Sequence, residues 1–330
     1  MNSNNELDKG EEDVKEDSKF EENSEQTDIK NESSKKTKTV KSAKKEIPLL
    51  MLVADTKYKV IKFVGKNVFN FKLTTNPEDN WDLCWQDLGV GVEVLAKMKS
   101  YQKINHFPGM YELSRKNNLA KNLMKMRKCF PKEFNFFPST WLLPSEFPEL
   151  LATSKKRHHI TYIAKPEASS QGRGIFLAKK IEDINPEEHL VVQKYIENPL
   201  LIDGLKFYLR IYVLLYGCNP IRLFLHKEGL ARFCTEKYQR PNAHNLQNNY
   251  THLTNYAINK TSDKFIFNTD YADSSKGHKR NLQCIFKYID ENGGDSNKVL
   301  TKIEDAIIKS IISAQPTLSH MYSSCPDDLD

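Results

Sequence analysis

The chain has 330 residues, of which 39% are hydrophobic and 10% aromatic, enough for one large folded domain or two smaller ones. Its net charge of +6 is uneven, with about −3 over residues 1–48 and about +9 over the rest. Every apolar run is shorter than the roughly 18 residues of a transmembrane helix, and the N-terminus has no apolar signal core. The six cysteines lack the spacing of a zinc site. Together these features favour a reducing, intracellular compartment with free thiols.

The first segment, residues 1–48, consists largely of Glu, Lys, Ser and Asn and has almost no large apolar side chains. Such a segment cannot bury enough apolar surface to offset the entropy lost on ordering, so it is predicted to be a disordered tail. Residues 49–330 are predicted to form the folded domain. The positive charge of this domain favours an acidic partner, which could be nucleic acid, an anionic membrane or an acidic protein tail.

The first half of the domain mixes strands and one clear helix. Residues Trp81–Trp85 are predicted to form a short buried strand, and Arg115–Cys129 a helix with Leu119, Leu123 and Met126 on one face. Further strands are predicted from their β-branched and aromatic content at Phe137–Leu143, His159–Lys165, Gly174–Ala178 and His189–Ile196.

The second half is predicted to be mostly antiparallel sheet. Lys206–Tyr216 is expected to be a central strand, and Ile221–His226 and Leu230–Phe233 are expected to flank a hairpin turn at Glu228-Gly229. A helix is predicted over Thr301–His320, with an apolar side formed by Ile303, Ile307, Ile308 and Ile311. The predicted fold class is α+β, without the regular alternation of a Rossmann fold.

A phosphate-binding loop is predicted after the strand that ends at Lys165. The chain lacks the GxxxxGK[ST], GxGxxG and kinase motifs, but Lys165-Pro166 leads into the small residues of ASSQGRG at 168–174. Small residues let backbone N–H groups approach a polyphosphate, and a lysine supplies a point charge. A loop with two glycines is more often an ordinary turn, so this motif needs support from others.

Six segments occur together in a fixed order: QKINHFPGM from Gln102, KPEASSQGRGIF from Lys165, VVQKYIENPLLIDGLKF from Val191, LRIYVL from Leu209, EGLARF from Glu228 and HLTNYAINK from His252. This set resembles the tubulin tyrosine ligase-like family, in particular its polyglutamylase branch, over about residues 81–325. The resemblance implies an ATP-grasp fold, in which two α+β subdomains clamp ATP. It also implies a ligase that phosphorylates a carboxylate, which the amino group of an incoming glutamate then attacks.

The resemblance also implies roles for individual residues. Lys165 and Lys206 would contact ATP, Gln171 and Gly172 would lie in the loop over the phosphates, and Thr254 and Asn255 would lie near the nucleotide. Lys116 would be a further phosphate contact. The backbone of Gln193, Lys194, Tyr195 and Ile196 would meet the adenine. The incoming glutamate would be held by Arg232, Tyr256 and Lys279, and a guanidinium suits that role because it can bind a carboxylate bidentately.

The chain departs from the family pattern in two main ways. First, Tyr208 stands where the family has an Asp expected to contact the nucleotide, and Ala257 in place of a family serine is a smaller change. The family also continues beyond the position of Cys325 into two strands whose Asp, Glu and Asn bind Mg²⁺. The chain is therefore expected to be an incomplete ATP-grasp domain with no metal ligand assigned, because Asp327, Asp328 and Asp330 follow a proline and lack that strand pattern.

Three functions are compatible with these features. The first is an ATP-dependent ligase that adds glutamate to the acidic C-terminal tails of tubulin, in the cytoplasm and cytoskeleton, with the cilium or basal body as a further location. It would act as a monomer without membrane or nucleic-acid partners. The second is a catalytically inactive short form that binds tubulin tails or nucleotide without transfer. The third is an unrelated basic module such as a nucleic-acid binder, although no RRM, KH or zinc pattern occurs.

Overall fold

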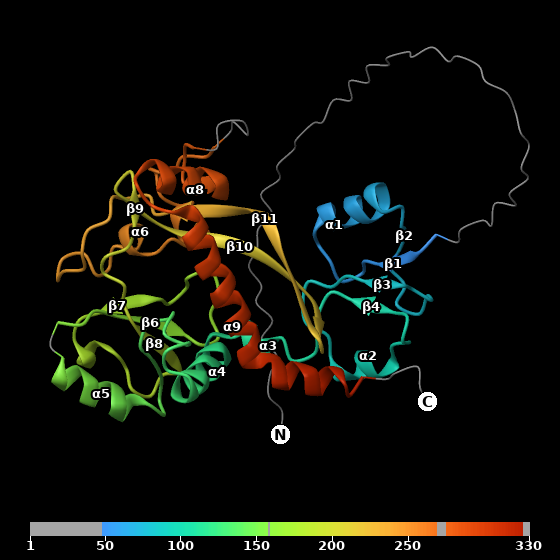
Figure 1. Ribbon diagram of the computed structural model, residues 1–330, viewed down its shortest axis with the longest axis horizontal. Coiled ribbons are helices and arrows are strands. Elements are labelled where there is room, and N and C mark those ends of the chain that lie inside the picture. The colour runs from blue at the N-terminus through green and yellow to red at the C-terminus, as the bar shows by residue number, and fades with distance from the viewer. Residues whose placement is uncertain (1–47, 158, 269–274, 326–330) are drawn as a thin grey trace, which may run out of the picture. The chain divides into compact units, whose positions relative to one another are not determined.

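The structure is a computed structural model that describes residues 48–157, 159–268 and 275–325 (Figure 1). Apart from Pro48, the predicted tail lies outside these ranges, as do Asp327, Asp328 and Asp330. The described residues belong to one unit that begins at Pro48. Within them, no helix combines the length and apolar character that crossing a membrane requires.

The N-terminal part of this unit is a small parallel sheet with strand order β2-β1-β3-β4. Its strands are β1 (Leu50–Leu52), β2 (Lys72–Thr74), β3 (Leu83–Cys84) and β4 (Lys103–Ile104). Its connections contain α1 (Lys59–Phe63), the π-helix η1 (Val64–Val68) and α2 (Val92–Lys97). Leu52, Trp81 and Cys84 form its buried core, so the strand predicted at Trp81–Trp85 is confirmed in its central two residues.

Two helices follow this sheet: α3 (Tyr111–Ser114) and α4 (Lys116–Cys129). The second confirms the predicted helix within one residue. Ala120 and Leu123 are buried on its inner side, and its last turn carries Arg127 and Lys128, which suit the negative end of a helix dipole.

An antiparallel sheet with the order β5-β8-β6-β7 forms the next layer. Its strands are β5 (Thr140–Leu142), β6 (Tyr162–Pro166), β7 (Phe176–Ala178) and β8 (Leu190–Lys194). They confirm the four predicted strands, each shorter than predicted, although β6 ends one residue later. The intervening segments contain α5 (Phe147–Lys156) and the 3-10 helix η2 (Ile181–Asp183). Trp141, Leu150, Tyr162 and Val192 pack together in its core.

A second antiparallel sheet has the order β9-β10-β11-β12. Its strands are β9 (Leu201–Ile202), β10 (Leu205–Cys218), β11 (Ile221–Phe233) and β12 (Lys279–Asn281). In Figure 1, β10 and β11 form one long hairpin. This sheet confirms the antiparallel arrangement predicted for the second half, whereas the parallel sheet at the start was not predicted.

The predicted hairpin turn at Glu228-Gly229 is wrong, because β11 runs through these residues without interruption. The last pair of the hairpin is Cys218–Ile221, which places the turn at Asn219-Pro220. At Gly229 the pairing instead shifts register. A Cβ atom there would lie 2.7 Å from the carbonyl oxygen of Arg210, so this glycine permits a close backbone approach at a bulge.

The remaining helices are α6 (Asn249–His252), α7 (Tyr256–Asn259), α8 (Leu282–Glu291) and α9 (Ser296–Tyr322). The predicted helix over Thr301–His320 is confirmed but extends further at both ends. Its buried residues are Ile311, Ala314 and Leu318, while Ile308 is 47% exposed, so the prediction that Ile308 lies on the apolar side is wrong. Ile311, Ala314 and Leu318 are spaced by three and four residues and form the buried face. Ile308, three residues before Ile311, fits the same spacing, so periodicity alone did not exclude it.

Candidate functional site

A cavity of about 580 Å³ opens between the two antiparallel sheets and α4. It brings together six of the residues that the family resemblance assigned to nucleotide binding. These six are Lys116, Lys165, Gln193, Lys206, Thr254 and Asn255. Apolar side chains complete the wall: Leu119, Ala120, Leu123, Phe137, Ile163, Ile175, Val191 and Leu253.

Strand β10 supplies one wall of the cavity because its side chains alternate between two faces. Lys206, Tyr208 and Arg210, spaced by two residues, all line the cavity. The intervening residues Leu205, Phe207 and Leu209 pack on the other face into a core with Phe233 and with Ile285 of α8. Burial of one apolar face against α8 therefore fixes which face of the strand presents its cations.

Lys165 is held at the end of β6 by the neighbouring strand. Its Nζ donates to Oε1 of Gln193 at 2.5 Å, and Nε2 of Gln193 donates to Oγ1 of Thr140 at 3.0 Å. Burial, and then the charge of Lys116, lower the pKa of Lys165 below its ordinary value. The amide of Gln193 thus orients the ammonium group, and its neutral oxygen leaves the positive charge uncompensated.

Lys206 is held in a buried polar cluster. Its Nζ donates to the hydroxyl of Tyr195 and to the carbonyl oxygen of His252, both at 2.8 Å, and it lies 4.4 Å from the centre of the Tyr195 ring. The Tyr195 hydroxyl is 3.2 Å from Nδ1 of His252. Burial lowers the pKa of His252 to about 4, with a further contribution from the charge of Lys206, so the imidazole is neutral near pH 7.

The charged side chains that line the cavity are cationic. Among the residues that the structure describes, the lining contains Lys116, Lys165, Lys206 and Arg210 but neither Asp nor Glu. Burial lowers the pKa of all three lysines, and that of Lys206 falls to about 8. The lysines also depress one another, because the charge of Lys116 acts on Lys165 and that of Lys165 on Lys206. Such an arrangement favours a polyanion, which would relieve the repulsion among the lysines.

Binding of a nucleotide is therefore expected to weaken as pH rises through about 8, where the ligand-free protein loses the Lys206 proton. A phosphate favours the charged ammonium, so the dissociation constant should rise by up to about tenfold per pH unit above that value. Titration of a fluorescent ATP analogue from pH 7 to 9.5 measures this. Lys206→Arg, which keeps its charge, should flatten the profile, and an equally steep profile in that variant would contradict the assignment.

The glycine loop is anchored to α4 and to the segment that follows α6. Nζ of Lys116 donates to the carbonyl oxygens of Pro166 (2.9 Å) and Ser169, so in the ligand-free protein it holds the loop. Gly172 is buried with φ +89°, and a Cβ atom there would lie 2.8 Å from Cγ of Asn255. Glycine at this position lets the loop pack directly against Asn255. Gln171, by contrast, is exposed and does not line the cavity.

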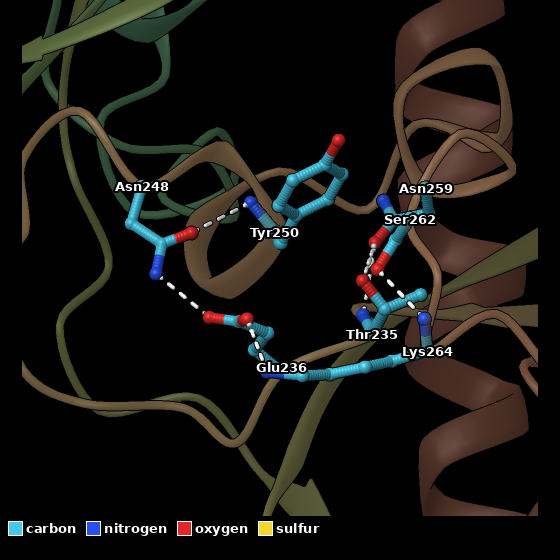
Figure 2. Close-up of polar contacts among 7 residues, drawn as sticks. All are labelled: Thr235, Glu236, Asn248, Tyr250, Asn259, Ser262 and Lys264. Atoms are coloured by element: carbon cyan, nitrogen blue, oxygen red, sulfur yellow. Dashed lines mark hydrogen bonds and ion pairs between the residues drawn. The ribbon is translucent and has the colours of Figure 1, made fainter.

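A polar network fixes the segment that carries Thr254 and Asn255, and Figure 2 shows its contact between Asn259 and Thr235. Asn259 is only 1% exposed, and its Oδ1 accepts from the backbone N and Oγ1 of Thr235, just after β11, at 2.9 and 3.2 Å. Its Nδ2 donates to the carbonyl oxygens of Leu253 (2.6 Å) and Asn255 (3.0 Å). One amide side chain therefore ties the end of β11 to both sides of Thr254.

A second part of this network, also visible in Figure 2, is centred on Glu236. Its carboxylate accepts from Nζ of Lys264 at 2.6 Å and from Nδ2 of Asn248 at 2.8 Å. The amide oxygen of Asn248 accepts from the backbone N of Tyr250 at 3.1 Å. These contacts lower the pKa of Glu236, first through its hydrogen bond from Lys264, and hold the chain on either side of α6 and α7.

We expect Asn259→Ala to lower the free energy of unfolding by about 2–4 kcal/mol, because it leaves buried backbone groups without hydrogen-bond partners. Asn292→Ala is the matched control: Asn292 is exposed and donates a single bond to the carbonyl oxygen of Tyr288, so its loss should cost under about 1 kcal/mol. Urea unfolding of the two variants measures the difference. Equal losses would show that the Asn259 network does not stabilise this segment.

The three residues assigned to the incoming amino acid also lie together. In the sheet register Arg232 of β11 pairs with Lys279 of β12 on one side and with Tyr208 of β10 on the other. Cζ of Arg232 is 6.0 Å from the centre of the Tyr256 ring, and Nη1 donates to the Tyr208 hydroxyl at 2.8 Å. The buried Nε of Arg232 has no hydrogen-bond partner within the described ranges, so the guanidinium retains donor capacity for a carboxylate.

The assignment of residues 193–196 to the adenine stays a prediction, and the structure shows how this segment is held. Only Gln193 lines the cavity, and the backbone N–H groups of Lys194 and Tyr195 donate to the carbonyl oxygens of Ser139 and Thr161. Ile196 is 60% exposed. Sheet pairing thus uses the amides of Lys194 and Tyr195, and the hydroxyl of Tyr195 accepts from Lys206.

Four polar residues that sequence reasoning did not assign also line the cavity: Thr140, Tyr208, Arg210 and His252. The two-residue spacing from Lys206 could have identified Tyr208 and Arg210 once that strand was predicted. No local pattern could have identified Thr140 and His252, because their positions depend on contacts with Gln193 and Tyr195 from distant parts of the chain.

The residues of the cavity do not fit a magnesium ion. Mg²⁺ prefers carboxylate and other oxygen ligands, and none of the carboxylates in the described chain faces this cavity. Across the described ranges, no group of three or more His, Cys, Asp and Glu side chains could hold a metal. The cations of the cavity would repel a metal that binds without its own anionic ligand.

Comparison with known proteins agrees with the motifs. Residues 94–328 match the tubulin-tyrosine ligase family. A probable beta-tubulin polyglutamylase of Tetrahymena thermophila is 52% identical over 288 residues, which cover 86% of this chain and 24% of the relative. The tubulin polyglutamylase ttll6 of Danio rerio is 48% identical over 247 residues, covering 75% of this chain and 31% of the relative. The tubulin polyglutamylase TTLL7 of Mus musculus is 37% identical over 303 residues, covering 91% of this chain and 33% of the relative. The chain thus spans between a quarter and a third of the length of these relatives.

Proposed function

The chain belongs to the tubulin-tyrosine ligase family, and from this we propose that it is an ATP-dependent ligase that adds glutamate to the acidic C-terminal tails of tubulin. The supporting observation is the pairing of two cationic sites: a cavity without carboxylates, and a cluster around Arg232 linked to it by Tyr208. We assign the activity to one ATP-grasp domain over residues 49–330, preceded by the tail at 1–48.

ATP fits the cavity in charge and in size, since nucleotide-sized ligands occupy pockets of about 300–1,000 Å³. Lys165 and Lys206 would bind the phosphates, Lys116 and Gly172 would hold the loop over them, and Thr254 and Asn255 would bind from the opposite side. Bound ATP would supply the phosphoryl group that activates a carboxylate as an acyl phosphate. The protein would contribute mainly by neutralising charge and by positioning, as in other phosphoryl transfers.

Arg232 would bind the carboxylate of the incoming glutamate, with Lys279 in register beside it and Tyr256 close to its guanidinium. This cluster would hold the amino group of glutamate near the activated carboxylate. The amine would displace phosphate as a C–N bond forms and a C–O bond breaks, with loss of a proton from nitrogen. Positioning two reactants in this way removes much of the entropic cost of the bimolecular reaction.

The acceptor is proposed to be acidic because the chain outside its first 48 residues carries about nine more basic than acidic side chains. Of the three relatives compared above, two are named tubulin polyglutamylases and one is named a probable beta-tubulin polyglutamylase. A tubulin substrate places the protein in the cytoplasm and cytoskeleton, with cilia and basal bodies as further locations. The proposal is that it works there as a monomer.

The test is incorporation of labelled glutamate into purified tubulin by the 330-residue chain with ATP and Mg²⁺, together with tubulin treated to remove its acidic tails. Incorporation that requires both ATP and the tails would support the proposal. Binding of nucleotide and of tubulin tails without incorporation by a folded sample would instead identify the non-transferring alternative. Binding to random DNA as tight as to tubulin would contradict both.

A further inference from the structure

Tyr208 lies at the junction between the nucleotide cavity and the carboxylate-binding cluster. Its side chain lines the cavity, and its hydroxyl accepts from Nη1 of Arg232 at 2.8 Å and from Nη2 of Arg210 at 3.3 Å. Each of the two guanidinium carbons lies 5.8–5.9 Å from the centre of the tyrosine ring. One phenol therefore contacts two cations that come from different strands.

The partner of these two arginines is unusual for this sheet because it is neutral. Arg280, on β12, donates instead to the carboxylate of Asp203 at 2.6 Å. For Arg210 and Arg232, no carboxylate partner occurs in the described part of the chain. A hydroxyl oxygen has two lone pairs, so it can accept from both guanidinium groups while leaving both positive charges uncompensated.

We propose that Tyr208 is a positioning residue that holds Arg232 as an uncompensated cation for the carboxylate of the incoming amino acid, an inference that rests on the ligase function proposed above. With Nη1 bonded to the hydroxyl, the Nε edge of the guanidinium remains for a ligand, and Nε has no partner within the described ranges.

This role predicts an effect on glutamate that is separate from any effect on ATP. Tyr208→Phe keeps the ring and the charges and removes only the hydroxyl, so Nη1 of Arg232 loses its acceptor. We expect the dissociation constant of glutamate to rise about tenfold, while that of an ATP analogue changes by less than about twofold. Calorimetric titration of glutamate, in the presence of the non-hydrolysable analogue, measures the first value.

Two further variants make the test specific. Tyr212→Phe removes a hydroxyl four residues further along β10, on the same face and 46% exposed, and should leave glutamate binding unchanged. If Tyr208 acts through Arg232, then in an Arg232→Lys background Tyr208→Phe should change glutamate binding by less than about twofold. Urea unfolding of Tyr208→Phe verifies that the fold is intact.

The outcomes separate this inference from the transfer reaction. Equal weakening of glutamate and of the ATP analogue by Tyr208→Phe, or a tenfold effect that persists with Arg232→Lys, would overturn the positioning role. Failure of the unaltered protein to bind glutamate would also overturn it. If Tyr208→Phe weakens glutamate binding as expected but no glutamate is incorporated into tubulin, the positioning role is supported. Only the proposed transfer reaction is then contradicted.

Discussion

Lys165→Met is expected to raise the dissociation constant for ATP by at least about a hundredfold and to abolish glutamate transfer. Lys165 is the last residue but one of β6 and lines the cavity, and its ammonium group is oriented by Gln193, whose amide is in turn held by Thr140. The side chain is half-buried, and this desolvation lowers its pKa, so its charge acts on a phosphate with less screening than a charge in water. Methionine keeps the apolar stem and removes the charge, which isolates the electrostatic contribution.

Lys179→Met provides the control, because Lys179 is exposed and lies just after the next strand, β7. Both variants are titrated with a fluorescent ATP analogue, and circular dichroism verifies that both are folded. We expect Lys179→Met to bind the ATP analogue with the same dissociation constant as the unaltered chain. A folded Lys165→Met protein that binds the analogue within about threefold of normal would show that this lysine does not contact the phosphates.

Arg232→Ala is expected to weaken glutamate binding by about a hundredfold while changing ATP binding only slightly. Arg232 does not line the nucleotide cavity; it sits between Tyr208 and Lys279 in the sheet register, beside the Tyr256 ring. Its loss removes the bidentate donor but leaves the lysines of the cavity in place. In a transfer assay the KM for glutamate should rise far more than the KM for ATP.

Arg222→Ala is the matched control, since Arg222 is exposed at the start of the same strand and ten residues from Arg232. Any general effect of losing a cation from β11 should occur in both variants, and the selective effect on glutamate only in Arg232→Ala. Equal increases in the two KM values for Arg232→Ala would contradict its role as the carboxylate-binding residue.

The two predictions differ because the site has two cationic regions with different surroundings. The cavity lysines are buried together and lower one another's pKa, so a polyphosphate has a large favourable effect on all of them. In the Arg232 cluster, by contrast, a single guanidinium is held in a fixed orientation by the neutral hydroxyl of Tyr208. Tyr208 lies between the two regions, lining the cavity while its hydroxyl accepts from Arg232.

Local sequence patterns predicted several of the elements from α4 onward. The apolar spacing of α4, the β-branched runs of β8 and β10, and the existence of α9 were correct, because each depends on which side chains a single element buries. The hairpin turn was misplaced because Glu228-Gly229 has the composition of a turn. Only the close approach of the β10 backbone shows that this glycine belongs to a bulge.

The sequence by itself determined the family, the order of the motifs and the cationic character of the nucleotide residues, because these follow from residue types at fixed spacing. The tertiary structure decided which residues share the cavity, since Thr140, Gln193, Tyr195 and His252 meet through hydrogen bonds between segments far apart in the chain. It also decided the role of Tyr208. In the sequence this residue is only a missing acidic group, but strand register places its hydroxyl between two arginines of neighbouring strands. Register depends on pairing across the whole sheet and on burial of its opposite face against α8, which no local pattern contains.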